Sequence, residues 1–188
     1  MKNKEIEYKY WANDLSKEDF LDKLKACKDV VSGRVSLPDS FYVVSCDDYY
    51  TKEDGDGSEF IRFRKGGTLY ELTIKKKENE NVVRTEVNLN VTDNEDSVVS
   101  EFIGLLGYSK AFQVYKEAWI WHLKECDISY YTLSDGRSVV ELEALNYLTV
   151  KEGVRTISYW EKALGLKSLK KESRSLYEIF SEEIKESL

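Results

Sequence analysis

The sequence is poor in three residue types, with one proline, one histidine and three cysteines among 188 residues. The single proline leaves no proline-rich linker, so we expect one domain over residues 1–188. Cys27, Cys46 and Cys126 form no CxxC pair, which argues against a disulfide framework and a zinc site. His122 alone cannot make a histidine-rich metal site. These scarcities favour a protein of the reducing cytoplasm.

Long apolar runs and an excess of positive charge are also missing. The first ten residues, MKNKEIEYKY, lack the apolar stretch of a secretory signal, and no window is apolar enough to predict a membrane span. The net charge of −7 disfavours a protein that coats DNA or RNA, although a local basic pocket can still bind a small phosphorylated ligand. We therefore expect a cytoplasmic protein with no nucleic-acid polymer and no membrane as partner.

What the sequence does contain is alternation of apolar and charged residues, a period of two that is typical of β-strands. It occurs at residues 5–10, 60–64, 72–75, 84–89 and 139–143. Asp135-Gly136 predicts a hairpin turn before the last of these segments. Loops are expected at residues 52–58 and 78–81.

Helix signals separate the strands. We expect a helix capped by Ser16, one capped by Thr92 and ended by Gly107, one over about Arg155 to Leu164 with Gly165 as its stop, and one around residues 176–184.

Like charges recur two residues apart on three strands, at Glu5 and Glu7, Arg62 and Arg64, and Glu141 and Glu143. Residues i and i+2 share a strand face, so each pair costs energy unless a counter-ion lies nearby. A charged strand face is ordinarily solvated surface, or part of a protein interface. Here, however, the opposite faces are apolar and can pack against the predicted helices, namely through Ile6, Tyr8, Ile61, Phe63, Leu72, Ile74, Val87, Leu89, Val140 and Leu142. A sheet that curls with its helices outside would place the charged faces inside.

Such an interior would contain both signs of charge. The acids are Glu5, Glu7, Glu86, Glu141 and Glu143, and the bases are Lys9, Arg62, Arg64, Lys75, Arg84 and Lys116. Buried charge is costly unless it is paired or binds a ligand. Arginine forks grip phosphates, and carboxylates two residues apart can hold Mg²⁺. A triphosphate with a divalent metal ion fits this composition.

The order of these residues resembles the CYTH superfamily of cyclases and thiamine triphosphatases, the triphosphate tunnel metalloenzymes. Glu5-Ile6-Glu7-Tyr8-Lys9 resembles the opening ExExK motif. The later motifs follow in order along nearly the whole chain: Cys46-Asp47-Asp48-Tyr49-Tyr50 for the D-x-Y strand, Arg62-Phe63-Arg64, Thr73-Ile74-Lys75, Arg84-Thr85-Glu86, Lys116 of K-x-R, Glu141-Leu142-Glu143, and Ser175-Leu176-Tyr177.

The resemblance implies an α+β fold, an antiparallel eight-stranded β-barrel (a triphosphate tunnel) with helices packed outside. It implies that Mg²⁺ or Mn²⁺ binds to Glu5, Glu7, Glu141 and Glu143. It also implies that phosphates bind to Lys9, Arg62, Arg64, Lys75, Arg84 and Lys116. Glu5, Glu7, Lys9 and Glu86 would be the catalytic residues. The layout is most similar to the branch of class IV adenylyl cyclases and thiamine triphosphatases.

Two positions depart from the family pattern. Ala118 stands where the family has the second basic residue of K-x-R, and Tyr131 stands where it has an aspartate. We expect hydrolysis of a nucleoside or thiamine triphosphate, because this simpler reaction tolerates the loss of one arginine better. A cyclase that makes cyclic AMP, and a weakened protein that binds or sequesters a nucleotide, stay open. We expect a small triphosphate or nucleotide as the partner, and a monomer or a homodimer.

Two groups near these motifs have more than one interpretation. Asp47 and Asp48 could extend the metal site, whereas the more common role for one of them is to end a strand or to pair with a nearby base. Trp119, Trp121, Tyr130 and Tyr131 could offer an aromatic surface to a base, whereas ordinary core packing is their more common role.

Overall fold

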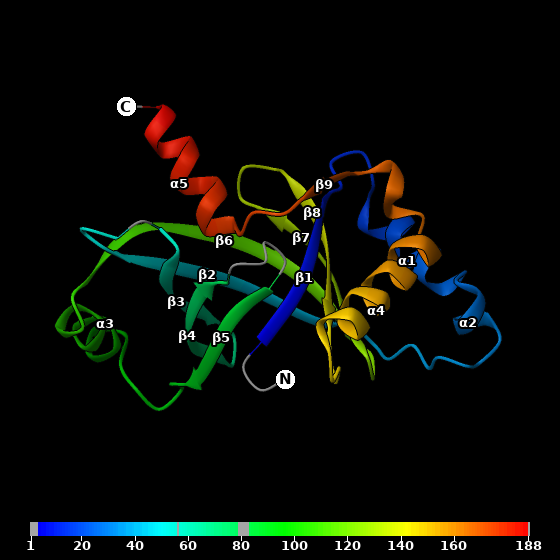
Figure 1. The fold of residues 1–188 in the computed structure, drawn as a ribbon, viewed down its shortest axis with the longest axis horizontal. Coiled ribbons are helices and arrows are strands. Elements are labelled where there is room, and N and C mark those ends of the chain that lie inside the picture. The colour runs from blue at the N-terminus through cyan, green and yellow to red at the C-terminus, as the bar shows by residue number, and fades with distance from the viewer. Residues whose placement is uncertain (1–3, 56, 79–82, 188) are drawn as a thin grey trace. The chain divides into compact units, whose positions relative to one another are not determined.

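The computed structural model describes residues 4–55, 57–78 and 83–187, so most of the loop expected at residues 78–81 lies outside it (Figure 1). The strands are β1 (Lys4–Trp11), β2 (Phe41–Lys52), β3 (Glu59–Gly66), β4 (Leu69–Lys77), β5 (Val83–Asn90), β6 (Tyr108–His122), β7 (Cys126–Leu133), β8 (Ser138–Ala144) and β9 (Lys170–Glu172). The helices are α1 (Lys17–Lys25), α2 (Lys28–Val31), α3 (Asp96–Leu105), α4 (Val150–Ala163) and α5 (Leu176–Glu186). All five alternating segments lie in strands, as predicted.

The strands form one antiparallel sheet in the order β5-β4-β3-β2-β6-β7-β8-β1-β9, and a further pairing of β5 with β1 closes it. The prediction of an α+β fold with an eight-stranded antiparallel barrel is therefore confirmed, and β9 adds a short ninth strand. The predicted hairpin between β7 and β8 is present, with Gly136 at a φ of 89°. Within the described ranges, no helix has both the length and the apolar character needed to cross a membrane.

The chain divides into two compact units. Unit 1 comprises Met1–Val44 and Lys116–Glu172, and unit 2 comprises Ser45–Tyr115 and Ser173–Leu188, so two boundaries fall within β2 and β6 and the third falls between β9 and α5. In each unit, the inner face of the strands is the face that carries the alternating charges, and the outer face is its opposite. One domain over residues 1–188 stays a prediction.

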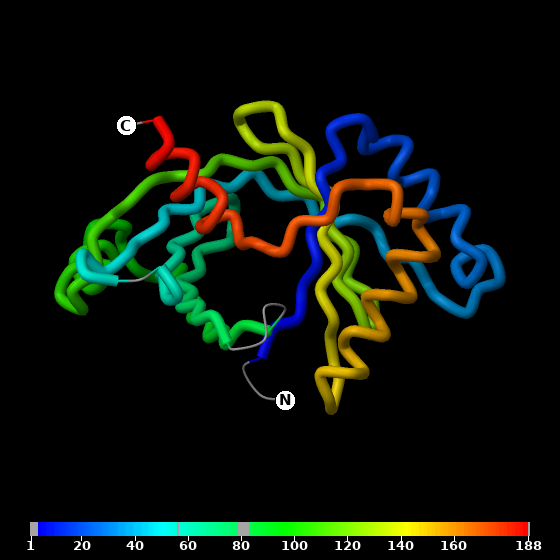
Figure 2. Tube along the Cα trace, turned by 45° about the horizontal axis from the view of Figure 1, so that its top comes forward, coloured from blue at the N-terminus to red at the C-terminus, as the bar shows by residue number. Residues whose placement is uncertain are grey.

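The outer face of unit 1 is covered by α4, which runs alongside β8 and β1 (Figure 2). The helix begins at Val150, earlier than predicted, because Thr149 and Glu152 form a capping box. Gly153 of α4 lies directly against β1, since a Cβ atom at this position would come within 2.8 Å of Ile6 Cδ1. Glycine therefore allows the close approach of α4 to the strand that carries Glu5 and Glu7.

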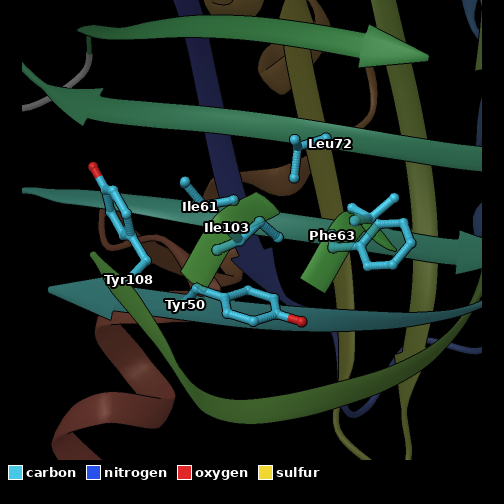
Figure 3. Close-up of a cluster of buried hydrophobic side chains, with 7 residues drawn as sticks. Tyr50, Ile61, Phe63, Leu72, Ile103 and Tyr108 are labelled. Atoms are coloured by element: carbon cyan, nitrogen blue, oxygen red, sulfur yellow. The ribbon is translucent and has the colours of Figure 1, made fainter. Parts of the chain in front are cut away.

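The outer face of unit 2 packs under α3. Ile61, Phe63 and Leu72 gather with Tyr50 around Ile103 of the helix (Figure 3). The helix begins at Asp96 with Glu95 as its N-cap, so the prediction of Thr92 as the cap is wrong. The backbone N–H of Thr92 instead donates to the side chain of Asn90 in a turn.

Three apolar residues of this outer face are not buried as expected. Ile74, Val87 and Leu89 are 37%, 36% and 55% exposed. A helix of ten residues is about 15 Å long, so α3 covers only part of the sheet. The outer side chains of β5 lie beyond it.

Candidate functional site

The inner face of unit 1 is rich in carboxylates. Glu5, Glu7 and Lys9 alternate along β1, and all three are less than 9% exposed. In the pairing of β1 with β8, Glu7 lies opposite Glu143 and Lys9 lies opposite Glu141. Lys9 Nζ forms an ion pair with Glu7 and lies 3.6 Å from Glu141 Oε2. The structure thus brings the predicted ExExK and ExE residues to one place.

Lys116 joins this group through an aromatic ring. Its Nζ lies 5.1 Å from the centre of the Tyr131 ring. The Tyr131 hydroxyl donates a hydrogen bond of 3.1 Å to Glu141 Oε2. The two departures from the family pattern are neighbours, because Ala118 lies directly opposite Tyr131 in the pairing of β6 with β7.

The carboxylates of unit 1 fit a hard divalent cation by their chemistry. Like charges that lie directly opposite each other, such as Glu7 and Glu143, repel and destabilise the pair of strands. A bound cation would remove this repulsion. Among the described residues, no three His, Cys, Asp or Glu side chains converge into a complete metal cage. Mg²⁺ ordinarily binds through one or two carboxylates together with substrate phosphates, so a pair of glutamates suits it.

The inner face of unit 2 carries cations, and each has a carboxylate partner within the unit. The most regular pair joins Arg64 of β3 to Asp47 of β2, with Nε–Oδ1 and Nη2–Oδ2 distances of 2.8 Å. Asp47 is fully buried. Burial alone would lower the pKa of Arg64, but the charge of Asp47 and its hydrogen bonds raise it. Arg64 is therefore held charged and in a fixed orientation.

Arg62 of β3 is only partly satisfied. Its Nη2 donates to Glu71 Oε1 at 3.1 Å and to Thr73 Oγ1 at 3.0 Å. Its Nε is buried and has no hydrogen-bond partner among the described residues. A buried N–H without an acceptor is uncommon, and a bound anion is one of the groups that would satisfy it.

Lys75 and Glu86 face each other across β4 and β5, and their Nζ and Oε2 atoms are 2.7 Å apart. Glu86 was predicted to be one of the catalytic residues. The structure places it in unit 2, paired with a predicted phosphate-binding lysine.

Arg84 of β5 is engaged by the start of α5. Its Nη2 donates to Glu178 Oε2 at 3.2 Å and to the Ser173 carbonyl at 3.1 Å. Glu178 also accepts from Lys77 at 2.9 Å and caps α5 through Ser175. Burial raises the pKa of Glu178, but hydrogen bonds from the Ser175 backbone and Lys77 outweigh it and lower the pKa to about 2.

Sequence reasoning missed several acids of the site. Asp47 pairs with Arg64, and pairing with a base is one of its expected roles. Asp48 lies on the outer face, where it forms ion pairs with Lys65 and Lys110. Glu71 and Glu178 were not considered at all. The Ser-x-x-Glu spacing at residues 175–178 predicts a capping box, but nothing in it predicts a partner on β5.

The aromatic residues near Lys116 divide between the two faces. Trp121 and Tyr130 are buried on the outer face, each with its ring 5.8 Å from Phe20 of α1. These two are core residues, which agrees with the ordinary explanation. Tyr131 is the member that reaches the inner face.

No protein-family model matches the chain, and neither does any curated protein sequence. Solved structures do match it. A candidate adenylate cyclase from Vibrio parahaemolyticus aligns with a TM-score of 0.71 and 17% identity, over 94% of this chain and 97% of that chain. A protein from Hippeastrum, described as a candidate adenylyl cyclase with a dominant triphosphatase activity, gives a TM-score of 0.56 and 12% identity, over 95% of both chains.

The same fold also occurs in a chain of the Schizosaccharomyces pombe Mediator head module, with a TM-score of 0.62 and 7% identity, over 89% of this chain and 97% of that chain. Likeness at these identities concerns the fold and not the activity. The fold that the resemblance implied is confirmed: this chain has the barrel fold of proteins described as candidate adenylate cyclases, one of them with a dominant triphosphatase activity.

Proposed function

We propose that this protein binds a nucleoside or thiamine triphosphate together with Mg²⁺ or Mn²⁺ and hydrolyses its terminal phosphate. The proposal is carried by the row of cations on the inner face of unit 2, and above all by Arg62, whose buried Nε has no hydrogen-bond acceptor in the part of the chain that the structure describes. A phosphate oxygen is an acceptor of the required charge.

Each set of residues has a role in this proposal. Arg62, Arg64, Lys75 and Arg84 would bind phosphate oxygens and neutralise charge that develops on the leaving group. Glu5, Glu7, Glu141 and Glu143 would hold the divalent ion, which supplies charge neutralisation and polarisation of the phosphate when bound. A glutamate of this set accepts a proton from the attacking water. Water then forms the new P–O bond and the leaving diphosphate keeps the electron pair of the broken one.

A second candidate function is binding without turnover. It is favoured by the carboxylate partner of each unit 2 cation, because a bound phosphate must compete with that partner. Attack by a ribose 3′-hydroxyl on the α-phosphorus, which releases pyrophosphate and cyclic AMP, is a third outcome of the same site. The description of structural neighbours as adenylate cyclases motivates its inclusion in the test.

A substrate panel distinguishes these functions. The purified protein is incubated with ATP, GTP or thiamine triphosphate, with Mg²⁺, Mn²⁺ or a chelator, and phosphate and cyclic nucleotide are both measured. We expect metal-dependent phosphate release that falls in Arg62→Gln and persists in Arg137→Gln, a change in the exposed hairpin turn. A thermal shift with every triphosphate but no product would favour binding alone, and no shift with any of them would contradict the whole proposal.

A further inference from the structure

Tyr131 and its neighbour Tyr130 form a natural comparison on β7. The two phenols are adjacent in sequence, equally buried and on opposite faces of the strand, at 2% and 4% exposure. The Tyr130 hydroxyl donates to the backbone carbonyl of Leu15 at 2.9 Å, which is a purely structural contact. The Tyr131 hydroxyl donates to a side chain of the candidate site, Glu141.

The ring of Tyr131 also contacts the candidate site. Lys116 Nζ lies over its face, at a distance at which a cation is attracted to an aromatic ring. One side chain thus touches both a predicted phosphate-binding lysine and a predicted metal-binding glutamate.

Space for this ring comes from Ala118. Ala118 lies directly opposite Tyr131 on β6 and is 3% exposed. A buried, close-packed position does not admit two large side chains, so the small residue and the large one form a matched pair. The absence of a basic residue at position 118 is therefore not a simple gap in the site.

We propose that Tyr131 is a positioning residue that fixes the Glu141 carboxylate for metal binding; this inference rests on the proposed function. Glu141 pairs with Ser129 on β7, so Tyr131 is its diagonal neighbour, within reach of an aromatic side chain. The backbone of Tyr131 is fixed by Ala118 on one side and Val139 on the other. A phenol held in this way keeps one carboxylate oxygen of Glu141 in place and leaves the other oriented for a ligand.

Filling of space does not explain the hydroxyl. A phenylalanine would occupy the same volume and keep the contact with Lys116. Residues that orient a metal ligand by a hydrogen bond ordinarily contribute 10–100-fold to metal affinity. The hydroxyl of Tyr131 is the group to which we assign that contribution.

The test compares Tyr131→Phe with Tyr130→Phe, using Mn²⁺ alone as the probe and no substrate. Mn²⁺ is titrated into the millimolar range, and the free ion is measured by electron paramagnetic resonance. We expect Tyr131→Phe to weaken Mn²⁺ binding about 10-fold or more, and Tyr130→Phe to change it less than about twofold. Both variants lose one buried hydrogen bond, so melting curves should show similar losses of stability.

A double-mutant comparison tests the route of the effect. If Tyr131 acts through Glu141, then Tyr131→Phe adds no further weakening in a Glu141→Gln background. Wild-type affinity in Tyr131→Phe, or equal weakening by Tyr130→Phe, would overturn the role of Tyr131 and leave the proposed function intact. A wild-type protein that binds no Mn²⁺ would overturn the metal site of the proposed function, and this inference with it.

Discussion

The inner faces of the two units handle charge in opposite ways. In unit 2 each predicted phosphate-binding cation has its own acid: Arg62 with Glu71, Arg64 with Asp47, Lys75 with Glu86, and Arg84 with Glu178. In unit 1 the predicted metal-binding acids, Glu5, Glu7, Glu141 and Glu143, outnumber the predicted lysines, Lys9 and Lys116. The predicted cations on the inner face of unit 2 are therefore each balanced by an acid, whereas on the inner face of unit 1 the predicted acids exceed the predicted lysines.

Because of this difference, the two inner faces favour ligands of different charge. A surplus of buried negative charge favours a bound cation, and the balanced pairs hold cations ready in fixed orientations. An anionic ligand of unit 2 must compete with carboxylates that are already in place.

The largest loss of stability is expected where a fully buried acid is removed from unit 2. Asp47→Asn leaves Arg64 charged beside a neutral amide, and we expect the free energy of unfolding to fall by about 3–5 kcal/mol. Urea denaturation measures this. Asp135→Asn, which alters an exposed pair in the β7–β8 turn, should cost less than about 1 kcal/mol. A similar small loss in Asp47→Asn would contradict the clamp on Arg64.

In unit 1, removal of acids should reduce turnover strongly and leave the fold in place. Glu5→Gln combined with Glu7→Gln should reduce metal-dependent turnover about 100-fold or more, about 2.7 kcal/mol, because two proposed metal ligands are lost. The fold should persist, because Lys9 keeps Glu141 as an acidic partner when Glu7 is neutralised, and repulsion among the remaining carboxylates falls. Phosphate release and a melting curve measure both effects. The matched control is Glu117→Gln, on the exposed side of β6. Unchanged turnover in the double variant would refute the metal assignment.

A loss of stability smaller than that of Asp47→Asn is expected when the charge of Glu178, at the start of α5, is removed. The pKa of Glu178 is lowered from 4.5 to about 2, so its charge stabilises the folded protein above pH 4.5, and this stability is lost as the pH falls toward 2. Glu178→Gln should lower the free energy of unfolding by about 2–3 kcal/mol at pH 7. Acid denaturation of both proteins should show the difference shrink between pH 4.5 and pH 2. A constant difference across that range would contradict a role for the Glu178 charge.

The smallest expected effect concerns Ala118. Restoration of the family's basic residue by Ala118→Arg should not raise turnover, because Tyr131 already fills the space opposite. Overpacking should cost about 1–3 kcal/mol of stability. Turnover and urea denaturation measure the two quantities. A gain in turnover would show that the arginine is simply missing.

The period-two pattern predicted the strands and their charged faces because alternation is a local property of a strand. Ser16 was correctly predicted to cap α1. Its side chain accepts a hydrogen bond from the backbone N–H of Asp19, which is only three residues away. Thr92 failed as a cap because the chain makes a turn at Asn90 before α3 begins at Asp96. Local signals thus located elements well and their first residues less well.

The partners of the charged residues could not be predicted in the same way. Glu178 follows Arg84 by almost a hundred residues, and only the approach of α5 to β5 brings them together. The pairing of Ala118 with Tyr131 depends on the register of β6 against β7, which no single position reveals. Sequence therefore identified which residues carry charge, and the fold determines which acid each cation meets.

The contact at Gly153 extends the candidate site to a position that touches no ligand. Ile6 lies between Glu5 and Glu7 on β1, and α4 approaches it so closely that even a methyl group on residue 153 would displace one of the two. Because a strand moves as a unit, a displacement of Ile6 by α4 would also displace Glu5 and Glu7, which point to the other face of β1. The back of α4 is thus a place from which a substitution, such as Gly153→Ala, would shift Glu5 and Glu7 although it touches neither of them.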